Sequence, residues 1–557
     1  MKMRQYIIGV LLVLALPVAA QEKDDHRFEV MKNLDVFNSI YKQLDLFYVD
    51  TLDPKVTIGA GIDAMLSSLD PYTEYYPAEK KGDFKMMVTG KYAGIGSLIR
   101  YDFSRKNVVI EEPYANMPAA EAGLKKGDVI LAIDDQSMEG RDNSYVSDRL
   151  RGDAGTTFVI KIRRPSTGKV MKIKVTRRAI QLPSVPYYGL RQDGVGYINL
   201  NQFTEGCAQQ VRRAFLDLKG KGMKKLVLDL RGNGGGVEQE AVSLVNMFVP
   251  KGKLIVSNRG RLKRMNNDYR TTVEPIDTVM PIVVLVNGET ASSSEITSGS
   301  LQDLDRAVVM GTRTYGKGLV QMTMPMPYNG SLKLTTNKYY IPSGRCIQAI
   351  NYKHNNGGYT EHVPDSLTKE FRTAGGRVVK DGGGITPDVE VKPDTLSNLT
   401  ISLLNSSPYM TRDSSELLLN YVVDYIAKHP TVAAPKDFEL TDADYEAFAK
   451  RVVDSGYTYA RDSEKYLQNL EKLARFEGYY DEAKPEFEAL KAKLSHNLAK
   501  DLRRNKQQLM EILAKEILPS YYYQAGTIEY GLKHDKTFDE AVKLLGDSDR
   551  YRKILHP

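Results

Sequence analysis

The chain has 557 residues, which is longer than one ordinary folding unit and suggests three or four domains. Hydrophobic residues make up 42% of it and charged residues 26%, a composition that supports packed cores and excludes an intrinsically disordered protein. The formal net charge is +7, but basic and acidic residues are interleaved, so the charge pattern does not indicate a nucleic-acid-binding protein.

The first twenty residues have the order of a secretory signal peptide. Lys2 and Arg4 precede an apolar run over residues 6–16, and small residues follow up to Ala20. This order predicts cleavage after Ala20 and an exported protein, which we expect in the periplasm of a Gram-negative bacterium. The alternative is a retained anchor, but the uncharged run is short for a bilayer span. We therefore expect no stable membrane anchor after cleavage.

Residues 21–88 are expected to form an N-terminal helical segment. Apolar residues between Val30 and Phe47 recur at spacings of three and four, which is typical of an amphipathic helix. The stretch SLDPYTEYYP then breaks the pattern at Asp70-Pro71 and at Pro77. These features predict a compact helical segment in front of the next domain.

Residues 89–181 change to short β-rich runs separated by glycine and proline, which predicts a small β-domain with two short helices. A Gly94-Ile95-Gly96 turn precedes a strand that contains Leu98, and GLKKGDVILAIDD follows. Such a turn can offer backbone N–H groups to a carboxylate, and an edge strand can pair with an extended peptide. These residues resemble a PDZ domain. The resemblance implies that Gly94, Ile95, Gly96 and Leu98 bind the free C-terminus of a protein.

Residues 182–396 alternate apolar strands with helices. The strand Leu226 to Leu230 leads into a glycine-rich turn and a helix, and the strand Ile282 to Val286 leads into a second turn and a helix that begins near Ser292. Alternation of this kind predicts an α/β core with a largely parallel sheet.

Residues 397–557 are expected to form a C-terminal helical domain. Thr441 and Asp444 have the spacing of a capping box, and leucines between Phe487 and Leu513 predict one long amphipathic helix. An apolar stripe of this kind is typical of a core or of a dimer seam, which leaves a homodimer open. The fold class predicted for the whole chain is therefore multidomain α+β.

Two short motifs suggest other chemistry and are disfavoured by their context. GTRTYGKG, residues 311–318, has the G-x-x-x-x-G-K pattern of a phosphate loop. It has Gly318 where magnesium binding needs Ser or Thr, and no helical pattern follows it. Ser166 and Lys169 have the Ser-x-x-Lys spacing, but they lie between two strand-like runs, which indicates a hairpin turn.

Cofactor chemistry is not indicated by the cysteines or the histidines. Cys207 and Cys346 are far apart in the sequence, and we expect buried free thiols rather than a disulfide. The seven histidines form no metal-ligand spacing. We therefore expect neither a metal nor another cofactor.

The residues themselves indicate a serine nucleophile at the start of a helix. The cluster Ser292-Ser293-Ser294 follows a buried strand and a turn, where the helix dipole and free N–H groups favour a developing oxyanion. The glycine loop Gly234–Gly236 follows another strand, so its amides are expected near the same point. No histidine lies between His26 and His354, and a lysine can act as the base if burial lowers its pKa from about 10.4 towards 7 or 8. The pattern alone does not choose among the three serines.

The segment ASSSEITSGSLQDLDRAVVMGTRTYGKGLVQ resembles the catalytic segment of the carboxyl-terminal processing peptidases, or tail-specific proteases, which use a serine-lysine dyad. LVLDLRGNGGG, SLDPYTEYYP, YYIPSGRCIQ and GGITPDVEV extend the resemblance over most of residues 30–395. The resemblance implies a crotonase-like sheet in the peptidase core, with Ser292 as the nucleophile, Lys317 as the base and Gln321 orienting the lysine. It further implies oxyanion donors at Gly236 and Ser293 and four supporting residues, which are Glu295, Asp303, Arg306 and Thr314. Ser293 departs from the family pattern, in which alanine is common.

These observations predict an exported serine endopeptidase that recognises protein C-termini through a PDZ-like domain and needs no cofactor. Its expected partners are protein substrates with free C-termini and not nucleic acid. The alternative is a PDZ-containing periplasmic binding or chaperone protein with a catalytically idle core. Residues 351–381 have no role that the sequence indicates.

Overall fold

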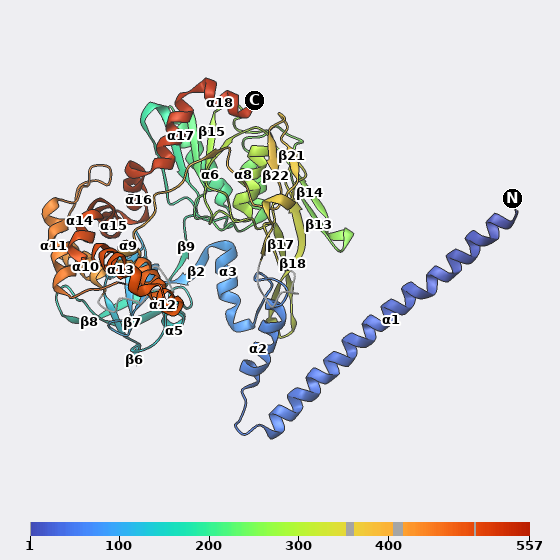
Figure 1. Ribbon diagram of the computed structural model, residues 1–557, viewed down its shortest axis with the longest axis horizontal. Helices are drawn as coiled ribbons and strands as arrows, with labels where there is room; N and C mark the ends of the chain where they lie inside the picture. Colours follow the sequence, from blue (N-terminus) through green and yellow to red (C-terminus); the bar gives the residue numbers. More distant parts are fainter. Residues whose placement is uncertain (1, 353–360, 405–415, 460, 495–496, 557) are drawn as a thin grey trace.

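The computed structural model describes residues 2–352, 361–404, 416–459, 461–494 and 497–556 (Figure 1). Residues 2–24 are described as backbone only, so the predicted signal peptide lies outside the described side chains. Where side chains are described, no helix is both long enough and apolar enough to cross a bilayer.

The N-terminal segment is helical as predicted but extended rather than compact. Helix α1 (Lys2–Phe47) projects away from the rest of the chain, and α2 (Pro54–Ser67) leads back to it (Figure 1). The projecting part of α1 exposes large apolar side chains, including Phe28, which is 63% exposed. Asp53 caps α2 by accepting a hydrogen bond from the Lys55 amide at 2.8 Å.

A second, antiparallel sheet that the sequence patterns did not indicate joins the N-terminal segment to the core. Strand β1 (Glu74–Tyr76) pairs with β18 (Ser331–Tyr340), which continues to β13 (Leu254–Gly260) and β14 (Asn267–Arg270). Strand β17 (Leu319–Pro325) also pairs with β18. The residues after Gly318 are therefore a strand and not the helix that a phosphate loop opens.

The β-domain has the predicted strands and its two short helices, α4 (Pro118–Glu121) and α5 (Asn143–Leu150). Its main sheet runs in the order β3, β4, β5, β7, β8, so β3 (Ser97–Asp102) is an edge strand, as an added peptide strand requires. The other members are β4 (Asn107–Pro113), β5 (Val129–Ile133), β7 (Thr157–Arg163) and β8 (Val170–Thr176), with β6 (Gln136–Ser137) beside β5. Ser166 and Lys169 lie in the turn between β7 and β8, as predicted.

The α/β core contains a six-stranded sheet in the order β10, β11, β12, β15, β16, β23, parallel except for the edge strand β10. Buried residues on one face of this sheet pack with those of helices α6, α7 and α8, and residues on the other face pack with α17 and α18. The strands are β10 (Tyr187–Leu190), β11 (Val195–Asn199), β12 (Lys225–Asp229), β15 (Ile282–Val286), β16 (Val308–Gly311) and β23 (Val389–Glu390). The helices are α6 (Cys207–Gly220), α7 (Glu238–Val245), α8 (Ser293–Asp303), α17 (Lys536–Gly546) and α18 (Ser548–Leu555).

The C-terminal region is helical, but the single long helix predicted from Phe487 to Leu513 is wrong. The stretch is divided among α13 (Tyr480–Leu494), α14 (Leu498–Arg504) and α15 (Lys506–Ile517), because Asn497 caps α14 and Asn505 interrupts the helical path. Leucines of the stripe, Leu502, Leu509 and Leu513, are buried in the helical domain, so they form its core. The remaining helices are α9 (Asn398–Leu403), α10 (Leu417–Lys428), α11 (Asp442–Asp454), α12 (Asp462–Glu477) and α16 (Pro519–Gly531).

Candidate active site

At the start of α8, Ser292 differs from Ser293 and Ser294 in its backbone conformation and in the hydrogen bonding of its hydroxyl. Ser292 has φ 55° and ψ −119°, a backbone conformation that non-glycine residues rarely adopt and that is frequent at functional sites. The Ser293 hydroxyl donates to the Gly236 carbonyl at 2.9 Å, and the Ser294 hydroxyl donates to the Asn233 carbonyl at 2.9 Å. Within the described chain the Ser292 hydroxyl donates no hydrogen bond, so it is the hydroxyl of the three that is available for chemistry.

The glycine loop after β12 lies against this serine. An added Cβ on Gly235 would lie 2.8 Å from Ser292 Cβ, and one on Gly236 would lie 2.2 Å from the Phe203 carbonyl oxygen. Both glycines also have positive φ, so no other residue fits either position. In the part of the chain that is described, the amides of Gly236 and Ser293 donate to no protein acceptor, as oxyanion donors must.

Glu295 connects the predicted nucleophile with the predicted base. Its carboxylate accepts from the Ser292 amide at 2.8 Å and from the Lys317 amide at 2.9 Å. It also accepts from the Thr314 hydroxyl at 2.5 Å and from the Gly316 amide at 2.7 Å. Desolvation raises the pKa of this fully buried carboxyl to about 7, while the four donors favour its charged form. The contacts fix the backbone of Lys317 relative to that of Ser292.

Lys317 has the electrostatic setting that a lysine base requires. Burial lowers its pKa to about 8, and the nearby positive charge of Lys333 contributes to the lowering. Its Nζ lies 4.1 Å from the centre of the Tyr72 ring. Tyr72 is held there because Asp70 accepts from its amide at 2.8 Å and its hydroxyl lies 2.9 Å from that of Tyr352. Among the described residues no hydrogen bond joins Lys317 to Ser292.

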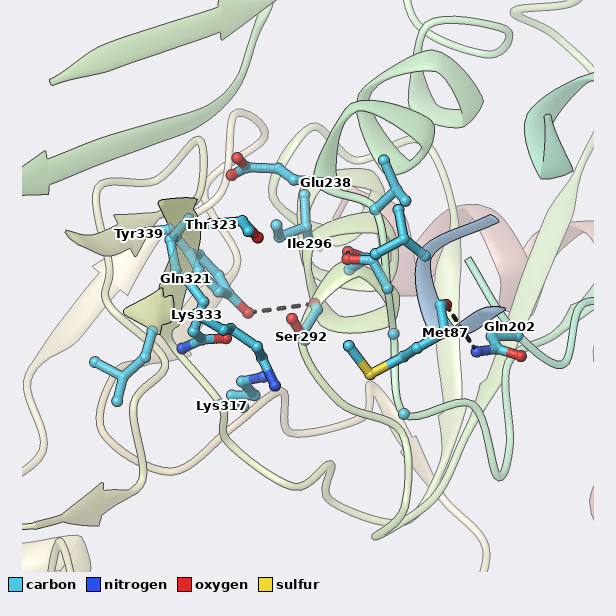
Figure 2. A pocket seen from close by; sticks show the side chains of 18 of the residues that line it. Met87, Gln202, Glu238, Ser292, Ile296, Lys317, Gln321, Thr323, Lys333 and Tyr339 are labelled. Atoms are coloured by element: carbon cyan, nitrogen blue, oxygen red, sulfur yellow. Dashed lines mark hydrogen bonds between the residues drawn. The ribbon is translucent and has the colours of Figure 1, made fainter. Parts of the chain in front are cut away.

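A cavity of about 580 Å³ brings most of the predicted catalytic residues together (Figure 2). Ser292, Ser293, Gly236, Lys317 and Gln321 all line it. The Gln321 amide donates to the Thr335 hydroxyl at 3.1 Å, and the described chain shows no hydrogen bond from it to Lys317.

None of the four predicted supporting residues lines this cavity, and two of them lie at or just beyond the far end of α8. Asp303 pairs with the buried Arg345 at 2.8 Å, and Arg306 donates to the carbonyls of Phe248 and Met280, each at 2.8 Å. These contacts anchor α8 in the core. Thr314 is instead beside Glu295, as described above.

The four predicted peptide-binding residues lie together at the start of β3. Gly94 ends strand β2 (Lys91–Gly94), which pairs with β9 (Arg178–Gln181), and Gly96 has φ 70°. The side chain of Ile95 is buried in the β-domain core, so only its backbone can meet a ligand. Leu98 is 47% exposed on the edge strand.

Sequence reasoning missed two residues of the site. Tyr72 lies in the quoted SLDPYTEYYP stretch, but nothing in that stretch shows that its ring would cover a lysine 245 positions later. Tyr339 is buried, lines the cavity, and donates from its hydroxyl to the Ser292 carbonyl at 3.3 Å. Both lie in or beside the antiparallel sheet that the patterns did not predict. Cys207 and Cys346 are free thiols as predicted, but only Cys207 is buried, whereas Cys346 is partly exposed.

Three family profiles match successive parts of the chain. They are a PDZ domain at residues 109–164, Peptidase family S41 at residues 194–363, and the C-terminal helical domain of probable PDZ-proteases at residues 409–545. A carboxy-terminal-processing protease of Bartonella bacilliformis is 37% identical over 351 residues, which cover 62% of this chain and 80% of that protein. A probable CtpA-like serine protease of Staphylococcus aureus is 33% identical over 354 residues, which cover 62% of this chain and 69% of that protein.

Among solved structures, the photosystem II D1 C-terminal processing protease is 26% identical with a TM-score of 0.35, covering 65% of this chain and 88% of its own. The identity to the Bartonella protease and the share of that protein that is covered establish the relationship. The chain belongs to peptidase family S41 and is a carboxy-terminal-processing serine protease with a PDZ domain and a C-terminal helical domain.

Proposed function

We propose that this chain is an exported, periplasmic endopeptidase that cuts proteins near their C-termini with a Ser292–Lys317 dyad. The observation that carries the proposal is the common cavity of Ser292, Lys317 and the amides of Gly236 and Ser293. The signal-like N-terminus supports export.

The reaction is acyl transfer. Neutral Lys317 takes the proton of Ser292, and Ser292 Oγ attacks the carbonyl carbon of the substrate. The amides of Gly236 and Ser293 donate to the resulting oxyanion. Lys317 then gives its proton to the leaving amine, the acyl-enzyme remains, and water resolves it with Lys317 again as the base.

Lys317 has to move for this step, because its Nζ lies over the Tyr72 ring and no hydrogen bond joins it to Ser292 among the described residues. Catalytic hydrogen bonds are often long or absent before substrate binds. Glu295 limits the motion to the side chain, since it holds the Lys317 amide. Gln321 lines the same cavity, and its side chain is proposed to orient Lys317 once the lysine has reached its catalytic position.

The PDZ domain is proposed to supply the substrate. A free C-terminal carboxylate is expected at the Gly94-Ile95-Gly96 turn, with the peptide paired along β3 beside Leu98. The partners are therefore protein substrates with free C-termini. The exposed apolar side chains of α1 also support a homodimer, through the N-terminal segment rather than through the buried C-terminal stripe.

Cleavage of an unfolded protein with mapped products tests the proposal. Ser292→Ala and Lys317→Ala should each abolish cleavage, while binding of a labelled C-terminal peptide remains. Equal cleavage by the wild-type protein and Ser292→Ala would reject the assigned nucleophile. Peptide binding without cleavage in the wild-type protein would support the idle binding protein instead.

A further inference from the structure

Glu238 is a carboxyl group in the catalytic cavity to which the reaction assigns no role. It is the first residue of α7 and follows Gly236 by two positions. It lines the cavity, and in Figure 2 it lies on the side of Ser292 opposite Lys317.

One oxygen of the Glu238 carboxyl group has no hydrogen-bond donor among the described residues. Its Oε2 accepts from Asn258 Nδ2 at 2.9 Å, but its Oε1 is buried and has no hydrogen-bond partner. The amide oxygen of Asn258 is also buried and unpartnered. Across the described residues no lysine or arginine forms an ion pair with Glu238. Buried acceptors in folded proteins almost always have donors, so two neighbouring acceptors without one indicate a missing donor group.

The lysines of the cavity itself are engaged elsewhere. Lys333 pairs with Glu74 at 2.8 Å, and Lys317 Nζ lies over Tyr72. Burial raises the pKa of Glu238, and the hydrogen bond from Asn258 opposes the rise. A carboxyl group in this state is costly to ionise alone and is stabilised in its charged form by an incoming cation.

The rest of this end of the cavity suits an aliphatic side chain. Ile296 lies one turn into α8 from Ser292 and lines the cavity together with Val237 and Tyr339. These residues offer apolar surface between the reacting serine and the Glu238 carboxyl. Lysine and arginine side chains combine an apolar stem with a charged, donor-rich tip.

We propose that Glu238 makes this end of the cavity a subsite for a basic side chain, lysine or arginine, on the residue whose carbonyl Ser292 attacks. The inference rests on the proposed function. With the carbonyl oxygen between the amides of Gly236 and Ser293, the side chain of the same residue extends past Ile296, and its N–H groups reach the Glu238 carboxyl group.

The test uses a peptide that the full-length enzyme cuts at one mapped bond. The peptide is made with lysine, arginine or norleucine before that bond; norleucine keeps the stem and lacks the charge. For the wild-type enzyme, kcat/KM should be about tenfold higher with lysine than with norleucine, the size expected for a hydrogen bond to a charged group. Glu238→Leu should cut the norleucine peptide with a higher kcat/KM than the lysine peptide, and Glu238→Gln should reduce the preference for lysine.

Glu274→Gln is the matched control, because Glu274 is exposed and does not line the cavity. It should keep the lysine preference. Cleavage of the norleucine peptide by Glu238→Leu shows that this variant is folded and active. A wild-type preference for norleucine, or a lysine preference that survives Glu238→Leu, overturns the inference and leaves the peptidase assignment intact. Failure of the wild-type enzyme to cut any peptide counts against the proposed function itself.

Discussion

The pKa of Lys317 gives the most quantitative prediction. The proposed dyad works only when this lysine is neutral, so kcat/KM should rise with pH and level off above the pKa. Burial, helped by Lys333, lowers that pKa from 10.5 to about 8. We therefore expect a single ionisation near pH 8 on the rising limb of the profile.

The free energy involved is substantial. The difference between 10.5 and about 8 corresponds to about 3 kcal/mol at about 1.4 kcal/mol per pH unit. At pH 7 roughly one molecule in ten would carry a neutral Lys317, whereas an ordinary lysine would be neutral in roughly one in three thousand. The buried site thus raises the active fraction by about 300-fold.

The same shift costs folding stability. The unfolded chain binds a proton at Lys317 more tightly than the folded chain does. Folding is therefore less favourable by about 3 kcal/mol below pH 8, and this loss is recovered as pH rises from 8 to 10.5. Lys317→Met should abolish cleavage and raise the apparent Tm at pH 7.

The assay is kcat/KM for a fluorogenic peptide between pH 5.5 and 9.5, with Tm measured in parallel. Lys333→Met removes a neighbouring positive charge and should move the midpoint to higher pH. Lys317→Arg should be inactive throughout, because a guanidinium keeps its proton. A flat profile, a midpoint near 10.5, or a Lys317→Met protein less stable than the wild type would refute the reasoning.

Two further predictions address the surroundings of the proposed dyad, and a third addresses an ion pair that joins β12 to α17. Ser293→Ala removes the hydrogen bond to the Gly236 carbonyl. It should lower kcat about fivefold with little change in KM, since such a bond contributes about 1 kcal/mol. An unchanged kcat counts against a positioning role for the Ser293 hydroxyl. Tyr72→Leu removes the ring that stabilises the Lys317 ammonium by about 0.5–1 kcal/mol and should shift the pH midpoint downwards, whereas Tyr72→Phe should keep it. Arg231 follows β12 and pairs with Asp229 of that strand and with Asp535, which caps α17. Arg231→Ala leaves these two carboxylates without this partner and should lower the free energy of unfolding by about 3 kcal/mol in denaturant titrations. A loss below about 1 kcal/mol would contradict this.

The sequence was sufficient where local pattern determines structure. The parallel strands Lys225–Asp229 and Ile282–Val286, the loops that follow them and the helix after Ser292 lie as the alternation predicts. The turn chemistry of Ser166 and Lys169 and the capping box at Thr441 are also as predicted. Each feature depends on neighbours a few positions apart.

The parts that were missed depend on contacts between distant residues. Tyr72 reaches Lys317 only because β1 pairs with β18, and Tyr339 reaches Ser292 through that same strand. The long helix expected up to Leu513 is divided at Asn497 and Asn505, and only the later leucines of the stripe pack in the helical core, whereas Leu490 is exposed. Periodicity records which residues are apolar but not where the chain turns between them.

The most direct measurement is the site of covalent modification during turnover. The enzyme is quenched while it cuts an ester substrate, and fragmentation mass spectrometry locates the acyl group within the α8 peptide. The dyad predicts an acyl group on Ser292, and its loss in Lys317→Ala. An acyl group on Ser293 or Ser294, or equal labelling of Ser292 in Lys317→Ala, contradicts it.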